Sequence, residues 1–263
     1  MLKIKTIIVA LTAIAGTAFV AIAAEKAMDN KQVDWSFNGP FGTFDRESSQ
    51  RGFQVFKNVC ANCHSLQYFT FRNLADLGYS EDMIKAFAAE YTVVDKEPDE
   101  FGDMVERVGI PADALPSPFA NQNAARAANN GAYPVDLSLI TKARADGPNY
   151  LYSLLTGYQD APADMDMGDL YYNPYFPGHK IAMAAPLSDD LIEYEDGTPA
   201  TLDNHAKDVV NFLHYVAEPK LEQRHRMGLS VMIFLLIMVV LTYLLNRKIW
   251  KPVKEGKTLW DHD

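Results

Sequence analysis

The residues with the clearest chemical potential in this chain lie in one five-residue segment, CANCH, at positions 60–64. Two thiols at this spacing can add to the two vinyl groups of one porphyrin, and the histidine that follows then lies beside the iron. C-x-x-C-H is therefore the attachment signature of a c-type haem. We predict one covalently bound haem c, attached through Cys60 and Cys63, with His64 as an axial ligand of the iron.

Two other uses of paired cysteines fit the sequence less well. A structural zinc site needs four ligands, and the chain has no second cysteine pair. A thioredoxin-like redox pair needs a βαβ context, which the surrounding sequence does not provide. Because the chain contains only these two cysteines, we expect the fold to form without a protein disulfide and the haem to contribute to the core.

The second axial ligand must come from another part of the chain. Met183 lies in the segment HKIAMAAPL, a loop of small residues upstream of the last helix expected in the body. We predict Met183 as the ligand. His179, only four residues earlier, is the strongest rival. His205 and His214 fall on the last expected helix and are predicted to be surface or helix residues without a role at the iron.

The N-terminal residues 1–24 are typical of a secretory signal peptide. Lys3 and Lys5 form a positive start, an apolar stretch covers residues 7–20, and small alanines then provide a cleavage site. The alternative is an uncleaved anchor helix. The polar and acidic sequence after Ala24 favours cleavage.

A second apolar run covers residues 227–245 and contains 19 residues without a charge. As a helix it would be roughly 28 Å long, close to the ~30 Å hydrocarbon core of a bilayer. We predict a transmembrane anchor at 221–246. Lysines and arginines are frequent after it, so the positive-inside rule places the tail, 247–263, in the cytoplasm and the body, 25–220, outside.

Residues 25–226 carry 17 basic and 31 acidic side chains, a net charge of −14. Such an acidic surface excludes nucleic acid as a partner. It is compatible with electrostatic attraction of a basic protein partner.

The spacing of apolar residues in the body is typical of helices, and no segment sustains the apolar–polar alternation that is typical of strands. Apolar spacing predicts four helices, at 48–60, 80–91, 150–157 and 203–217. Met83 lies on the apolar face of the second, where a methionine usually fills the core, and the core is expected to end with the fourth. The loops between them are unusually long for a compact domain, as expected if they wrap a large flat group. The predicted fold class is mostly α: a haem domain enlarged by long loops, plus one C-terminal transmembrane helix.

The helix before the haem motif resembles the first helix of ordinary cytochromes c in its G-x-x-x-F-x-x-x-C-x-x-C-H pattern. Gly52 lies eight residues before Cys60, and Phe56 lies four before it. In that family the glycine lets the last helix cross at close range. We expect Phe212 and Tyr215 to be the crossing residues. An amphipathic helix with an incidental glycine is the alternative.

Longer blocks resemble one family closely: cytochrome c1, the haem c subunit of the cytochrome bc1 complex. The resemblance extends from about Phe44 to Lys254. Val135, where the family usually has a second proline, and His179, where it commonly has glutamine, depart from the pattern. The shared blocks are RGFQVFKNVCANCHS (51–65), AARAANNGAYPVDLSLI (124–140), NYLYSLLTGY (149–158), LYYNPYFPGHKIAMAAPL (170–187), YEDGTPAT (194–201) and VAEPKLEQRHRMGL (216–229).

The resemblance implies an electron-transfer subunit of quinol–cytochrome c oxidoreductase, which is not an enzyme on its own. Its expected partners are cytochrome b, a Rieske iron–sulfur protein as electron donor, a cytochrome c as acceptor, and the lipid membrane. The signal peptide suggests a bacterial inner membrane, with the haem domain in the periplasm. The alternative is a membrane-tethered electron shuttle that works without a bc1 complex, which would need a flexible linker beside the anchor.

The resemblance also implies roles for residues around the haem. Arg126 would pair with a haem propionate, and Pro134, Asp136 and Leu137 would frame the haem edge. From the residues alone, Arg126 could equally pair with surface carboxylates of this acidic domain.

Overall fold

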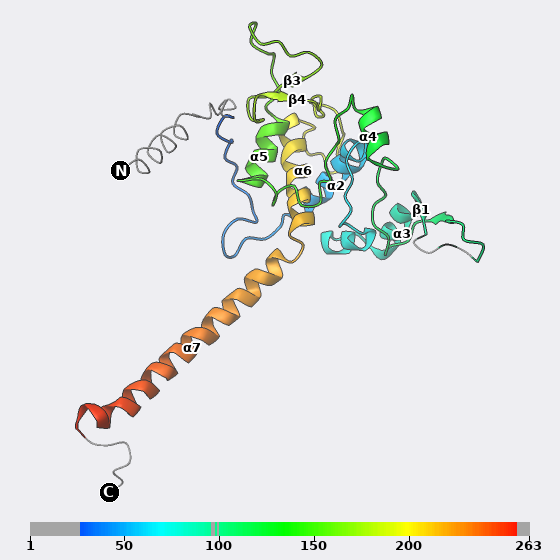
Figure 1. Cartoon of the computed structure of the whole chain (residues 1–263). Coiled ribbons are helices and arrows are strands. Elements are labelled where there is room, and N and C mark those ends of the chain that lie inside the picture. Colours follow the sequence, from blue (N-terminus) through cyan, green and yellow to red (C-terminus); the bar gives the residue numbers. More distant parts are fainter. Residues whose placement is uncertain (1–26, 96–97, 99, 257–263) are drawn as a thin grey trace, which may run out of the picture.

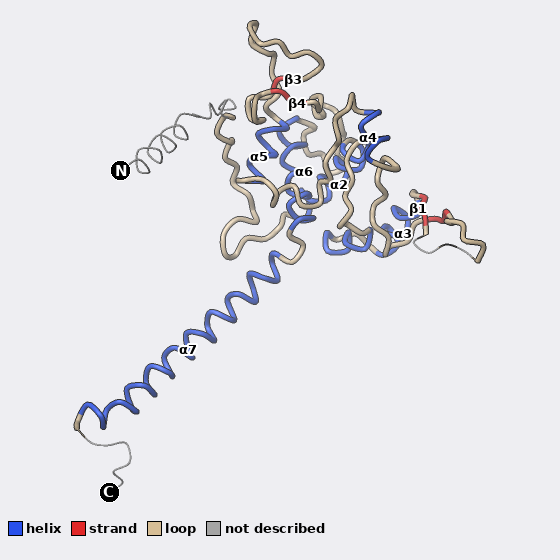
Figure 2. Tube along the Cα trace, viewed as in Figure 1, coloured by secondary structure: helices blue, strands red, loops and turns tan. Residues whose placement is uncertain are grey.

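The computed structural model of the chain describes residues 27–95, 98 and 100–256. The predicted signal peptide and the last seven residues of the predicted tail lie outside the described residues. A helical body with long connecting loops sits at one end of a single projecting helix (Figures 1 and 2). This arrangement confirms the predicted fold class.

All four helices expected in the body are present, with ends shifted by a few residues. The seven-residue α4 was missed because its sequence, QNAARAA, has no apolar repeat. Two short 3₁₀ helices and two small antiparallel hairpins complete the described body. The elements are α2 (Arg46–Asn58), η1 (Cys60–Asn62), η2 (Phe71–Leu77), α3 (Glu81–Ala89), β1 (Thr92–Val94), β2 (Glu106–Val108), α4 (Gln122–Ala128), α5 (Gly147–Leu155), β3 (Tyr171–Tyr172), β4 (Lys180–Ile181), α6 (Leu202–Ala217) and α7 (Leu221–Lys254).

The centre of the core is the crossing of α2 and α6. A Cβ atom added to Gly52 would lie 2.0 Å from the carbonyl oxygen of Asp208 and 2.7 Å from Cβ of Phe212. Only glycine therefore permits this approach, as the cytochrome c-like pattern predicted. Tyr215, the second expected crossing residue, lies farther along α6, where its ring meets that of Phe44 at 5.6 Å.

The prediction that His205 and His214 are surface or helix residues is correct for the helix, since both lie on α6, but neither side chain is at the surface. His205 is 0 % exposed and His214 is 9 % exposed, because α6 is enclosed by other parts of the body along most of its length. Nδ1 of His205 lies 2.8 Å from the hydroxyl of Tyr194, and the ring of His214 lies 4.1 Å from that of Phe37. Burial lowers the pKa of His214 to about 4, so this side chain is a neutral part of the core.

The expectation that Met83 fills the core is also wrong. Ser80 caps α3 as its sequence suggests, with its hydroxyl accepting a hydrogen bond from the backbone N–H of Met83 at 3.3 Å. However, only Ile84 and Ala88 of this peripheral helix are buried, and Met83 is 48 % exposed.

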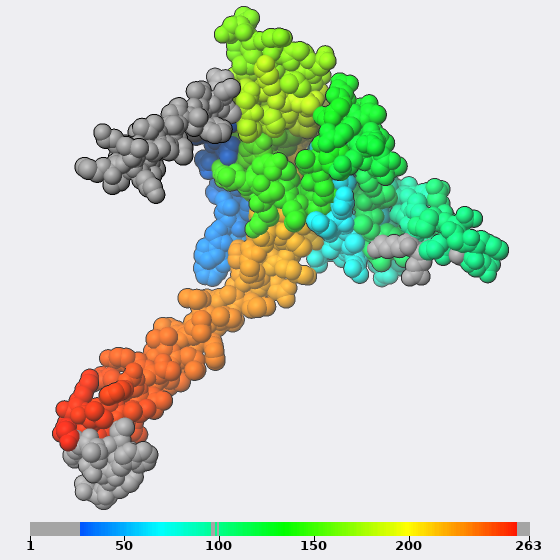
Figure 3. Space-filling view, in the orientation of Figure 1, coloured from blue at the N-terminus to red at the C-terminus, as the bar shows by residue number. Residues whose placement is uncertain are grey.

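The helix α7 has 34 residues, a length of about 51 Å. Within the described part of the chain it is the helix long and apolar enough to cross a membrane. It projects from the body with its side chains exposed (Figure 3). These properties fit a single-pass membrane anchor, and the helix continues beyond the apolar run at both ends.

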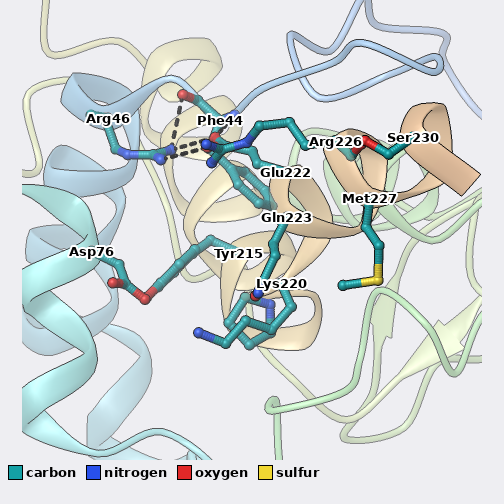
Figure 4. A pocket seen from close by; sticks show the side chains of 11 residues that line it. Phe44, Arg46, Asp76, Tyr215, Lys220, Glu222, Gln223, Arg226, Met227 and Ser230 are labelled. Carbon is teal, nitrogen blue, oxygen red and sulfur yellow. Dashed lines mark hydrogen bonds and ion pairs between the residues drawn. The ribbon is translucent and has the colours of Figure 1, made fainter.

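The first turns of α7 are bound to the body, contrary to the expectation that the core ends with α6. Leu221 is 4 % exposed and belongs to the core. The carboxylate of Glu222 accepts hydrogen bonds from the guanidinium of Arg46 at 2.8 and 2.9 Å and from the backbone N–H of Phe44 at 2.9 Å (Figure 4). Nδ1 of His225 lies 3.1 Å from the carbonyl oxygen of Gly42.

This junction determines where a soluble haem domain can be cut. We expect a chain ending at Arg226 to be folded and soluble. A chain ending at Glu218 should be less stable by about 3 kcal/mol, because it loses the buried Leu221 side chain and leaves Phe44 N–H without its acceptor. Denaturant unfolding of the two haem-loaded fragments measures the difference. Equal midpoints would show that α7 contributes nothing to the core.

Candidate haem-binding site

The CANCH segment begins where α2 ends. The chain tightens into η1, and the backbone N–H groups of Cys63 and His64 both donate to the carbonyl of Cys60, at 3.1 and 2.8 Å. Both thiols are free, Cys60 partly buried and Cys63 exposed. Burial, with a smaller effect of Cys63, raises the pKa of Cys60 to about 12. The two thiols form no disulfide with each other and lie at the two ends of the η1 turn, a spacing compatible with attachment to one porphyrin.

The ring of His64 is held by one specific hydrogen bond. Its Nδ1 lies 2.7 Å from the carbonyl oxygen of Val135. A carbonyl can only accept, so Nδ1 carries the proton and Nε2 keeps its lone pair for a metal. Burial lowers the pKa of His64, although the Val135 carbonyl and Asp136 oppose this effect. A neutral imidazole with an available Nε2 fits the proximal ligand of a haem iron.

The loop that supplies this carbonyl is braced by Asp136. Its carboxylate accepts hydrogen bonds from the Ser65 hydroxyl at 2.8 Å, the Gln67 N–H at 2.9 Å and the Ser138 N–H at 2.9 Å. Burial disfavours the charged form, but these hydrogen bonds from Ser138, Gln67 and Ser65 together lower the pKa of Asp136. The carboxylate therefore joins Ser65 and Gln67, just after the CANCH segment, to the loop whose carbonyl orients His64.

Two cavities flank this brace. One, of about 280 Å³, is lined by Cys63 and Pro134 together with Ala125 of α4 and Tyr133. The other, also of about 280 Å³, lies by Val135 and Asp136 and is lined further by hydrophobic residues and Arg144. Gln67 lines both. The structure thus places Pro134 beside a predicted attachment cysteine.

Arg126 lies on α4, next to Ala125 of the first cavity. Its side chain is exposed, donates to the carbonyl of Gly131 at 2.9 Å and lies 5.6 Å from the ring centre of Tyr133. Within the described residues it forms no ion pair. The alternative role, pairing with surface carboxylates, has no support in this part of the chain.

Met183 follows the β3–β4 hairpin and is half-buried. Its carbonyl accepts a hydrogen bond from the Tyr158 hydroxyl at 3.0 Å. His179 lies in the turn of the hairpin with a positive φ of 59°, buried, with its ring 5.9 Å from that of Tyr172. Hydrogen bonds thus connect His64, Val135 and Asp136 into one unit, whereas Met183, after β4, and Arg126, on α4, form separate hydrogen bonds.

Sequence reasoning missed Ser65, Gln67, Ser138 and the carbonyl of Val135. No local pattern marks them, because they act through short hydroxyls and backbone groups that any loop contains. Only the resemblance in the block 124–140 pointed to this part of the chain.

The helical body, the attachment segment with its oriented histidine and the apolar C-terminal helix define the class: a membrane-anchored haem protein of electron transfer. A sequence model described as the Cytochrome C1 family matches residues 35–253, and the chain belongs to this family.

Relatives of known name agree with this assignment. Cytochrome c1 of Rhodospirillum rubrum is 46% identical over an alignment of 272 positions, which covers 95% of this chain and 98% of that protein. The cytochrome b-c1 complex catalytic subunit of Candida albicans is 47% identical over 93% of this chain and 85% of that protein. Cytochrome b/c1 of Bradyrhizobium diazoefficiens is 47% identical over 86% of this chain, which spans only 36% of that longer protein.

The family confirms the class inferred from the sequence. Cytochrome c1 proteins bind haem and serve as electron-transfer subunits of the bc1 complex, and they are not enzymes by themselves. The resemblance to cytochrome c1, which the sequence showed from about Phe44 to Lys254, is therefore confirmed over nearly all of that range.

Proposed function

We propose that this protein carries single electrons from a Rieske iron–sulfur protein to a cytochrome c within a bc1 complex of a respiratory or photosynthetic chain. One haem c would be attached covalently through Cys60 and Cys63, with His64 and Met183 as axial ligands. When bound, the haem supplies a one-electron iron couple. The observation that carries the proposal is the hydrogen bond between His64 Nδ1 and the Val135 carbonyl, inside a C-x-x-C-H segment.

The chain's own residues would hold and orient the group. The Val135 carbonyl accepts the Nδ1 proton of His64, so Nε2 would be free to bind the iron, and the hydrogen bonds of Asp136 hold the loop of Val135 in place. Arg126, without an ion-pair partner within the described residues, is available for a propionate, and Pro134 would frame the haem edge. A methionine opposite a histidine raises the reduction potential of haem iron, and two protein ligands leave no coordination position for a substrate.

The expected partners follow from the family and from the relatives' names. A relative named cytochrome b/c1 and another named as a b-c1 complex subunit support cytochrome b as a direct partner. The basic residues that follow the apolar run support a cytoplasmic C-terminus. The haem domain would then face the periplasm of a bacterium, anchored in the inner membrane by α7.

A tethered shuttle without a bc1 complex is the alternative, and the junction with α7 argues against it. Glu218 forms ion pairs with Lys142 and Arg224, and Glu222 pairs with Arg46. These contacts hold the body against the first turns of the anchor. A shuttle needs the opposite, a flexible linker that lets the haem domain travel.

Copurification tests the proposal directly. The affinity-tagged chain, extracted from its native membrane in a mild detergent, should carry b-type haem and a Rieske cluster with it. The purified material should reduce cytochrome c with added quinol. Recovery of the haem-loaded chain alone, still reducible but without b-type haem, would favour the tethered shuttle.

We predict that electron transfer to a basic cytochrome c slows steeply with added salt. Opposite charge raises the rate of encounter more than it tightens a transient complex, and the body carries a net charge of −14. Raising the ionic strength from 0.1 to 1 M shortens the Debye length from about 10 to about 3 Å. Stopped-flow reduction of the acceptor across a salt series measures the second-order rate constant.

Neutralising one acidic run should make the rate constant of electron transfer depend less on added salt. The run at 160–169 immediately precedes the hairpin that leads to Met183, so Asp164→Asn, Asp166→Asn and Asp169→Asn together should have the largest effect. The matched control is Asp95→Asn, Glu100→Gln and Glu106→Gln, three changes of charge in the arm around β1 and β2, which projects away from β3 and β4 (Figure 1). A flat salt series for the unmodified protein would contradict charge-guided docking.

A further inference from the structure

The segment 182–188, which contains Met183, has little structure of its own to hold it. No helix or strand of the described chain lies between β4 and α6, and the three alanines of the segment are exposed. Within the described residues one hydrogen bond reaches it, from the Tyr158 hydroxyl to the Met183 carbonyl at 3.0 Å. The next anchor is Leu187, whose side chain is buried in the core. The Met183 backbone is therefore held by a contact from another part of the chain.

Tyr158 is itself fixed by the end of α5. The backbone N–H of Gly157 donates to the Leu154 carbonyl at 3.4 Å, which closes the last turn. A Cβ atom added to Gly157 would lie 2.5 Å from the carbonyl oxygen of Ser153 and 2.4 Å from the ring of Tyr175. Glycine thus permits the chain to leave the helix in close contact with this ring, and Tyr158 follows directly.

The same end of α5 also holds the hairpin that leads to Met183. The side-chain amide of Asn173, directly after β3, donates to the Leu154 carbonyl at 2.8 Å, and Asn173 is fully buried. Figure 1 shows α5 beside β3 and β4. On its other side α5 is joined to α6, because the Tyr152 hydroxyl donates to the Asp203 carboxylate at 2.6 Å. The end of α5 is therefore a fixed support that contacts the segment 171–183 near both of its ends.

We propose that Tyr158 is a positioning residue for the axial ligand, and this inference rests on the proposed function, in which Met183 is that ligand. The Tyr158 hydroxyl donates to the main chain of Met183, so the thioether sulfur stays free to bind the iron. Burial, with a smaller effect of Tyr150, raises the pKa of Tyr158, so the hydroxyl keeps the proton that it donates. Without this bond the segment 182–188 would leave the iron more often.

Added imidazole measures how often Met183 leaves the iron. Imidazole can coordinate only where the methionine has moved away, so its apparent affinity rises in proportion to the fraction of molecules in which that position is open. One hydrogen bond of this kind changes such an equilibrium by about fivefold. Tyr158→Phe should therefore bind imidazole about fivefold more tightly than the unmodified protein.

The experiment uses the full-length, haem-loaded, oxidised chain in detergent, titrated with imidazole and followed by haem absorbance. The matched control is Tyr215→Phe, which also removes a hydroxyl that donates to a backbone carbonyl, that of Asn73 at 2.8 Å. It should leave the imidazole affinity unchanged. Thermal loss of the haem absorbance reports the stability that each variant has lost, so a general loosening of the body is measured separately.

A double variant tests whether Tyr158 acts through Met183. Met183→Leu should bind imidazole far more tightly than the unmodified protein, and adding Tyr158→Phe to it should change the affinity no further. An unchanged affinity in Tyr158→Phe alone, an equal increase in Tyr215→Phe, or a further increase in the double variant would each overturn the role of Tyr158 while leaving the proposed function intact. A Met183→Leu chain with the affinity of the unmodified protein would overturn the ligand assignment and this proposal together.

Discussion

Replacement of Met183 with leucine is expected to leave the haem attached but to lower its reduction potential strongly. Attachment depends on Cys60 and Cys63, which the change does not touch, whereas a thioether ligand favours reduced iron. Axial ligands set haem potentials over a range of about 0.8 V, so the loss should be a substantial part of that range. A redox titration of the purified variant, followed by haem absorbance, measures it.

The controls separate Met183 from its neighbours. Met83→Leu makes the same chemical change at an exposed position on α3 and should leave the potential unchanged. His179→Gln introduces the residue common in the family and should have a small effect. If Met183→Leu retained the potential of the unmodified protein while His179→Gln lowered it, His179 would be the ligand and the assignment of Met183 would be wrong.

Replacement of Asp136 with alanine is expected to destabilise the haem domain by several kcal/mol. Two part-buried donors, the Ser65 hydroxyl and the Ser138 N–H, lose their acceptor together with the exposed Gln67 N–H, and an unsatisfied buried donor costs about 1–3 kcal/mol. For a domain of this size a loss of about 3 kcal/mol lowers the melting temperature by roughly 10 °C. Thermal loss of the haem absorbance of the full-length chain in detergent measures the shift.

The same carboxylate predicts a dependence on pH. Since hydrogen bonds lower the pKa of Asp136 in the folded protein below its ordinary value, its contribution is complete above that ordinary value and is lost as the pH falls through the folded value. The difference in melting temperature between the unmodified protein and Asp136→Ala should therefore be constant at neutral pH and shrink in strong acid. Glu47→Gln, an exposed change on α2, should melt like the unmodified protein at neutral pH. A difference in melting temperature that increased at acidic pH would contradict the stabilising role of the ionised Asp136.

The local parts of this protein could be predicted from its sequence. The spacing in CANCH predicts haem attachment because Cys63 and His64, three and four positions after Cys60, must lie on adjacent turns. The uncharged run at 227–245 indicates a membrane helix because its length matches a bilayer. The four longer helices of the body, including the glycine in α2 that allows the close crossing, follow from apolar spacing. Each of these signals lies within a few turns of one segment.

Only the tertiary structure decided which distant groups meet. The carbonyl that orients His64 comes from Val135, 71 positions away, and the donors to Asp136 come from both segments. His205 and His214 look like ordinary polar positions on an amphipathic helix, yet α6 is enclosed along most of its length and buries both. Leu221 and Glu222 belong to the body although they begin the membrane helix. Backbone carbonyls and short hydroxyls leave no pattern in a sequence, because their role depends on which chain segments packing brings together.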